Sequence, residues 1–151
     1  MRILLTGGNG YIGKSILKNF KKYEIITLTR SVADLTDSQA INKFFKTQEE
    51  FDVVIHTAIV GGSRLKEEDY KTVHSNMMMY YNLLENRHRF NKFISFGSGA
   101  ELFSTHTPYG LSKKIINESI KDKENFYNIR IFAVFDENEL PTRDRKSTRL
   151  N

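Results

Sequence analysis

The chain has 151 residues, a net charge of +5 at neutral pH and no cysteine. This length fits one domain with a sizeable core, and 39% hydrophobic and 27% charged residues are ordinary for a globular protein. The absence of cysteine excludes disulfides and thiolate metal sites. Basic residues are scattered over expected helix faces or gathered in residues 144–151, without a basic stripe interleaved with aromatics, which argues against nucleic-acid binding.

The sequence shows no targeting or membrane segment. The apolar run at residues 3–5 is too short for a signal peptide, and no stretch approaches the roughly 18 apolar residues of a membrane span. We therefore expect a cytoplasmic protein without a membrane partner. The four histidines have no ligand spacing with one another or with carboxylates, so we expect no metal site.

Short apolar runs alternate along the chain with longer segments of helical periodicity. The expected strands are residues 3–5, 24–29, 53–55, 93–96 and 129–135, with a very short further strand around 32–33. The expected helices begin after the glycine-rich turn at 7–13, at Asp37 or Ser38, at Tyr70 and at Pro108. On the long third helix, we expect one side to carry Tyr70, Val73, Met77, Tyr80, Tyr81 and Leu84. This alternation predicts a doubly wound α/β domain, a parallel sheet covered on both faces.

The C-terminal end does not fit this alternation. Residues 144–151 have neither apolar periodicity nor capping residues. We expect residues 1–143 to form the domain and residues 144–151 to be a disordered or non-native tail on a truncated chain.

A glycine-rich loop lies directly between the first expected strand and the first helix. Glycines at positions 7, 10 and 13 allow a tight turn, close backbone approach to a pyrophosphate and close packing of helix on strand. The helix N-terminus adds free N–H groups for phosphates. Glycine triplets also occur in flexible turns, but this strand–turn–helix context indicates dinucleotide binding. We expect cofactor contacts from Gly7, Gly10, Tyr11, Ile12 and Gly13.

The end of the second strand indicates which dinucleotide is bound. An acidic residue there would bind the ribose 2′-hydroxyl of NAD, whereas an arginine suits the 2′-phosphate of NADP. The sequence has Arg30 and Ser31 and no acid, which favours NADP, with NAD as the alternative. Arg30 is otherwise a solvated loop residue. Asp34, followed by Leu35, is either a ligand of the adenine amino group or a turn residue.

Tyr109 and Lys113 are four residues apart at a helix start and so share one face. A tyrosine hydroxyl titrates near 10, and a nearby ammonium lowers that pKa by favouring the phenolate. The pair can then act as one acid/base unit, with the lysine also holding the nicotinamide ribose. The same spacing is common in exposed pairs without function.

Ser98 follows the strand at residues 93–96, at the strand end where open α/β sheets bind ligands. Its hydroxyl can hydrogen-bond the substrate oxygen that the tyrosine protonates. Ser95 is the competing serine, but it lies inside the expected strand. We therefore predict Ser98, Tyr109 and Lys113 as the catalytic residues.

The Thr-Gly-x-x-Gly-x-x-Gly loop, Ser98 and Tyr109-x-x-x-Lys113 resemble the extended short-chain dehydrogenase/reductase family, the NAD-dependent epimerase/dehydratases. Residues 58–62 and 75–78 are similar to the GDP-fucose synthase group of nucleotide-sugar epimerase-reductases. The resemblance implies a Rossmann fold, NAD(P), a nucleotide-sugar substrate and a homodimer. It carries cofactor contacts to Thr57 and Ala58, and it matches Asn76 to the family's long-helix asparagine, which is otherwise an ordinary polar helix residue.

Two departures from the family limit what this chain is expected to do alone. The family's C-terminal substrate domain is absent, and Phe135-Asp136-Glu137 stands where relatives have glycine and often proline. Both departures argue against catalytic activity of this chain on its own. The sequence leaves open whether the reaction is epimerisation, dehydration or reduction. A non-catalytic NAD(P)-binding regulatory module on the same fold is the alternative, although such regulators lack the tyrosine–lysine pair.

Overall fold

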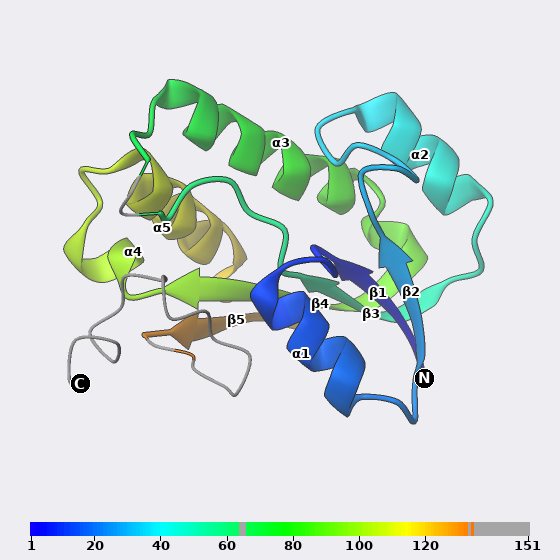
Figure 1. The fold of residues 1–151 in the computed structure, drawn as a ribbon. Helices are drawn as coiled ribbons and strands as arrows, with labels where there is room; N and C mark the ends of the chain where they lie inside the picture. The colour runs from blue at the N-terminus through cyan, green and yellow to red at the C-terminus, as the bar shows by residue number, and fades with distance from the viewer. Residues whose placement is uncertain (64–65, 133, 135–151) are drawn as a thin grey trace.

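Five parallel strands form the centre of the molecule in a computed structural model that describes residues 1–63, 66–132 and 134. The strands are β1 (Arg2–Thr6), β2 (Glu24–Leu28), β3 (Phe51–His56), β4 (Phe90–Ser98) and β5 (Phe126–Ile131). They pair in the order β2-β1-β3-β4-β5 (Figure 1). The runs of β1 and β3 are almost wholly buried, which is typical of parallel strands covered on both faces.

The helices are α1 (Tyr11–Asn19), α2 (Ser38–Lys46), α3 (Tyr70–Glu85), α4 (Ala100–Phe103) and α5 (Pro108–Ile120), with a 3-10 turn η1 (Arg87–Arg89). Asp37 caps α2 by accepting a hydrogen bond from the Ala40 N–H, and Thr107 caps α5 with Pro108 in its first turn. Helix α1 lies on one face of the sheet, and α2, α3 and α5 lie on the other (Figure 1). The predicted doubly wound α/β fold is confirmed.

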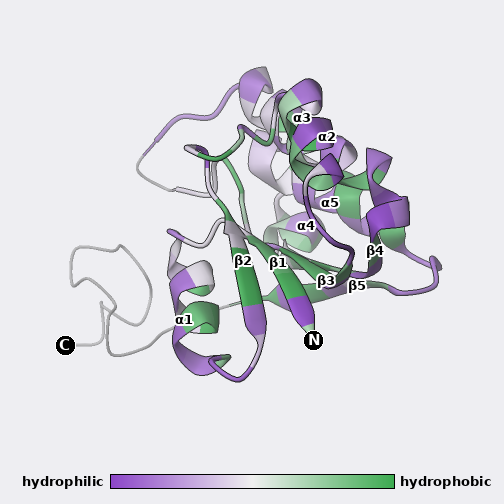
Figure 2. Cartoon of the chain, turned by 90° about the vertical axis from the view of Figure 1, so that its right-hand side faces the viewer, coloured by the Kyte–Doolittle hydropathy of each residue, from purple (hydrophilic) through white to green (hydrophobic). Residues whose placement is uncertain are grey.

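Two hydrophobic clusters fill the space between the sheet and its helices. Ile16 of α1 packs with Ile3, Leu5 and other residues of β1 and β3. On the other face, the larger cluster joins α2, α3 and α5, with Tyr80 and Phe93 fully buried in it. Figure 2 shows the hydrophobic residues concentrated on the strands and on the inner sides of the helices. No helix in the described part of the chain is long and apolar enough to cross a membrane.

Two sequence-based predictions about the elements were wrong. Residues 32–33 form a turn, which is closed by hydrogen bonds from both N–H groups to the Thr29 carbonyl. The last strand begins at Phe126 and ends at Ile131, because Asn125 starts it from a left-handed conformation with φ 65°. The predicted strand residues 133 and 135, like the predicted tail at 144–151, lie outside the described residues.

The buried side of α3 also differs from the predicted one. Tyr70 and Tyr81 are 75% and 49% exposed, whereas Thr72 and Asn76 are buried. A buried asparagine is stable only when its amide is hydrogen-bonded, and Asn76 bonds to the Val60 backbone and to Ser112. Because a satisfied polar side chain occupies the buried side, apolar periodicity alone gave the wrong helix face.

Candidate functional site

The carboxyl ends of the parallel strands share one edge of the sheet, and the predicted site residues follow these ends. β1 and β3 are neighbours, but β1 leads to β2 on one side of the pair and β3 leads to β4 on the other, so the connections after β1 and β3 diverge at this edge. Such a switch point is where open α/β sheets bind ligands. The glycine-rich loop after β1 lies there, beside residues 57 and 58 after β3.

The glycine loop has the geometry that close phosphate approach requires. Gly7 adopts a left-handed φ of 72°, and the Gly10 N–H donates to the Gly7 carbonyl at 2.9 Å. A Cβ on Gly13 would overlap the Gly7 carbonyl oxygen and lie 2.6 Å from the Gly8 Cα, so helix α1 packs directly on the turn. Gly10 caps α1 without a side-chain hydrogen bond. Because Gly10 has no side chain to cap the helix, the N-terminus of α1 suits a pyrophosphate.

Residues at the ends of β1 and β3 hold this loop in place. Thr57 Oγ1 donates to the Thr6 carbonyl at 2.7 Å, and the Ala58 N–H lies 3.4 Å from Thr6 Oγ1. A Cβ on Gly7 would lie 2.6 Å from the Ala58 nitrogen, so backbone meets backbone here. His56 Nδ1 is 2.8 Å from Thr6 Oγ1, and burial, with the Lys113 charge, lowers the pKa of His56 to about 3. His56 is therefore a neutral, buried support of the loop.

The segment after β2 exposes Arg30 and places it beside Asp34. Arg30 is 81% exposed, and its Nε lies 3.5 Å from Asp34 Oδ2. Asp34 Oδ1 accepts hydrogen bonds from the backbone and side chain of Thr36, which lower the pKa of Asp34 and make it a turn residue. Leu35 is buried in the core, and its carbonyl accepts a hydrogen bond from Asn82. Adenine contacts from Asp34 and Leu35 stay predictions.

The three predicted catalytic residues converge at the end of β4. Ser98 is the last residue of β4, whereas Ser95 is buried inside the strand. Tyr109 is the second residue of α5, and Lys113 follows one turn later with its Nζ 5.7 Å from the centre of the Tyr109 ring. The Lys113 ammonium donates to the Phe96 carbonyl of β4. The structure thus brings the hydroxyls of Ser98 and Tyr109 and the Lys113 ammonium together.

The expected lowering of the tyrosine pKa was wrong in sign for this structure. Burial raises the pKa of Tyr109 above its usual value of 10.0, a hydrogen bond with the Ser98 side chain lowers it, and the charges of Glu68 and Glu101 raise it. Burial lowers the pKa of Lys113 to about 8 against the raising effect of Glu101. Tyr109 is therefore protonated at neutral pH and suited to donate a proton.

Sequence reasoning missed the part that Glu68 plays. Glu68 directly precedes Asp69, the N-cap of α3. The Glu68 carboxylate instead accepts hydrogen bonds from the N–H groups of Gly62 and Tyr109, at 2.5 and 2.9 Å. A Cβ on Gly62 would lie 3.0 Å from the Tyr109 ring, so Glu68 holds the backbone at Gly62 against this tyrosine. Only the tertiary fold brings these segments together.

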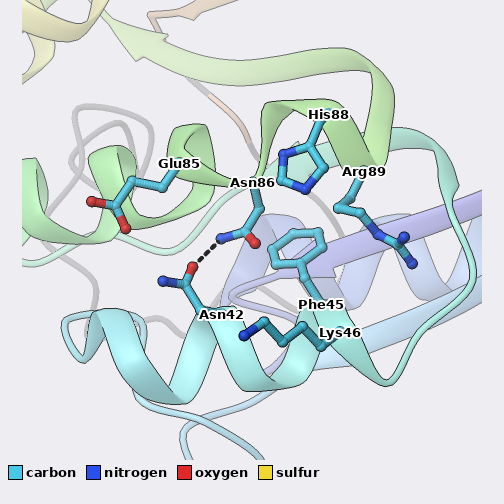
Figure 3. A pocket seen from close by; sticks show the side chains of 7 residues that line it. All are labelled: Asn42, Phe45, Lys46, Glu85, Asn86, His88 and Arg89. Carbon is cyan, nitrogen blue, oxygen red and sulfur yellow. Dashed lines mark hydrogen bonds between the residues drawn. The ribbon is translucent and has the colours of Figure 1, made fainter.

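A cavity of about 580 Å³ lies away from this site. Its lining residues come from the ends of α2 and α3 and from η1 (Figure 3): Asn42, Phe45, Lys46, Glu85, Asn86, His88 and Arg89. These segments precede β3 and β4, so the cavity is at the amino edge of the sheet, opposite the carboxyl edge. Within residues 1–63, 66–132 and 134, no three His, Cys, Asp or Glu side chains gather in a way that could hold a metal ion.

The comparison with known proteins agrees with this arrangement. The model of the NAD dependent epimerase/dehydratase family matches residues 3–138. The chain belongs to this family. This confirms the resemblance seen in the glycine loop and the tyrosine–lysine pair.

Several relatives of this epimerase/dehydratase chain are named after GDP-linked sugars. The chain is 33% identical over 122 residues to GDP-L-colitose synthase of Yersinia pseudotuberculosis, covering 77% of this chain and 39% of that protein. It is 28% identical to GDP-L-fucose synthase of Escherichia coli (strain K12), covering 64% and 32%. A GDP-mannoheptose C4 reductase from Campylobacter jejuni with NADP bound has the same fold, at 22% identity and a TM-score of 0.74, covering 89% and 52%. The chain thus spans about half or less of these relatives.

Proposed function

We propose that this chain is the cofactor-binding and catalytic part of an NADP-dependent nucleotide-sugar oxidoreductase that reduces a sugar carbonyl. The observation that carries the proposal is the convergence of Ser98, Tyr109 and Lys113 at the sheet edge that also holds the glycine loop. The names of the curated relatives support a nucleotide-sugar substrate, and the Campylobacter reductase supports NADP. A homodimer of the complete polypeptide also stays a prediction.

NADPH, held by the glycine loop and Arg30, would supply the hydride for the carbonyl carbon of the sugar. Ser98 and Tyr109 hydrogen-bond the carbonyl oxygen, and Tyr109 donates the proton that turns it into a hydroxyl. Lys113 in its charged form would hold the nicotinamide ribose, and its charge stabilises the tyrosinate left by that transfer. The neutral state of Tyr109 in this structure favours the reductive direction, in which a proton donor is needed.

An NADPH oxidation assay separates an enzyme from a regulatory module of the same fold. We expect the full natural-length polypeptide that contains this chain to consume NADPH only when a GDP-linked 4-keto sugar is added. Loss of NADPH absorbance measures this rate. A polypeptide that binds NADPH tightly but shows no sugar-dependent oxidation with GDP-, dTDP-, UDP- or ADP-linked keto sugars would support the regulatory module instead.

Arg30→Ala tests the cofactor preference. We expect NADPH affinity to fall about tenfold or more, since a hydrogen bond between charged groups contributes about 1.5–3 kcal/mol, while NADH affinity is unchanged. Fluorescence titration of the nicotinamide measures both dissociation constants. Lys121→Ala, which removes an exposed cation at the far end of α5, is the matched control. Equal NADPH binding by wild type and Arg30→Ala would show that Arg30 is only a solvated loop residue.

A further inference from the structure

Glu101 is a buried carboxylate beside the site that the proposed reaction does not yet use. It is the second residue of the four-residue helix α4, directly after β4, and its side chain is 1% exposed. A Cβ on Gly97 would lie 2.6 Å from Glu101 Oε2, so glycine at this position leaves room for the carboxylate. Burying a charged carboxylate is costly unless charged and polar groups surround it.

The partners of Glu101 come from two strands that frame the site. Its Oε2 accepts a hydrogen bond from the Ser98 N–H at 3.3 Å, which ties the carboxylate to the end of β4. On β5, Asn128 donates to Oε1 at 3.3 Å, and Arg130 forms an ion pair with the same oxygen. Glu101 therefore fixes the backbone of Ser98 relative to β5, and its charge is balanced on one side by Arg130, which is 35% exposed.

Glu101 lies beside the part of β4 that Lys113 contacts: the Lys113 ammonium donates to the Phe96 carbonyl, and a Cβ on the next residue, Gly97, would lie 2.6 Å from Glu101 Oε2. Lys113 is 7% exposed, and burial alone drives its pKa down, while the Glu101 charge raises it. Tyr109 on the same helix and the neutral His56 of β3 are further titratable neighbours of Lys113. A buried ammonium needs such a counter-charge to remain protonated.

We propose that Glu101 is a positioning residue of the site: its carboxylate fixes Ser98 and is the buried counter-charge for Lys113. Only the effect of Glu101 on catalysis rests on the proposed function. The charge relation itself is a property of the folded chain. Glu101 thus lets a lysine that is enclosed between α5 and β4 remain cationic, as the proposed ribose contact requires.

Glu101→Gln tests this role because glutamine keeps an oxygen for the Ser98 N–H and removes the charge. We expect the titration midpoint of Lys113 to fall by about one pH unit or more, since the loss of a nearby opposite charge disfavours the charged form. The measurement is a pH titration of the ¹³C-labelled lysine ε-carbons by NMR, on the chain without cofactor. Lys113→Arg identifies the signal by its disappearance.

Arg130→Gln is the matched control. It breaks the same ion pair but removes a positive charge, so the Lys113 midpoint is expected to rise. A general loosening of the fold would move both midpoints the same way, and that result would overturn the proposal. An unchanged midpoint in folded Glu101→Gln, checked by circular dichroism, would overturn it as well.

If Glu101→Gln does not fold, Arg130→Gln decides the question, because a midpoint that fails to rise contradicts the counter-charge role. Glu101→Asp, which keeps the charge, is expected to retain the wild-type midpoint. The titration does not depend on turnover, so its failure leaves the proposed function standing. Conversely, a chain without sugar-dependent oxidation can still show the predicted shifts. In an active polypeptide, Glu101→Gln is expected to move the alkaline fall of kcat to lower pH.

Discussion

Tyr109→Phe is expected to lower the rate of sugar-dependent NADPH oxidation by about 10²–10⁴-fold, the range typical of a lost general acid. The ring and its packing against Gly62 remain, so NADPH affinity and thermal stability should stay at the wild-type level. The comparison of kcat with the NADPH dissociation constant checks this separation. The effect is large because the variant removes the group that donates a proton to the sugar carbonyl oxygen during hydride transfer.

Tyr127→Phe is the control for this experiment, since this tyrosine is 48% exposed on β5 and pairs in register with Ile94, away from the end of β4. It should leave the rate unchanged. Wild-type turnover in Tyr109→Phe would remove the acid/base assignment, although the glycine loop would still indicate cofactor binding.

Gly13→Ala is expected to weaken both the fold and cofactor binding. The new methyl would overlap the backbone of Gly7 and Gly8, which cannot rotate away as a side chain could. Overpacking of this kind costs about 1–3 kcal/mol, and the displaced loop should lower NADPH affinity about tenfold or more through weakened phosphate hydrogen bonds. Urea unfolding and NADPH titration measure the two effects.

Gly10→Ala separates crowding from the general loss of a glycine. Gly10 has an extended backbone, with φ −77° and ψ 170°, and a Cβ there would meet only the Gly7 carbonyl at 3.2 Å among the described residues. Its loss of unfolding free energy should be clearly smaller than that of Gly13→Ala. Equal losses would mean that direct packing of α1 on the turn does not explain the glycine at position 13.

The sequence-based errors share a physical cause. The polar Asn76 occupies the buried side of α3 because Val60 and Ser112 satisfy its amide, and no periodicity in the sequence contains that information. Glu68 has no signal in the sequence because its partners, Gly62 and Tyr109, lie in segments that only folding brings near.

The sequence alone determined the α/β alternation, the glycine loop after β1, the placing of Ser98 at the end of its strand and the placing of Tyr109 and Lys113 one turn apart on one helix. These features depend on local periodicity, on glycines with unusual backbone freedom and on spacing within one helix, all of which are local properties of the sequence. Only the tertiary structure decided the charge balance of the site. Burial and the distant carboxylates of Glu68 and Glu101 keep Tyr109 protonated, and Glu101 opposes the effect of burial on Lys113. Such electrostatic effects depend on which groups become neighbours and lose water when the chain folds.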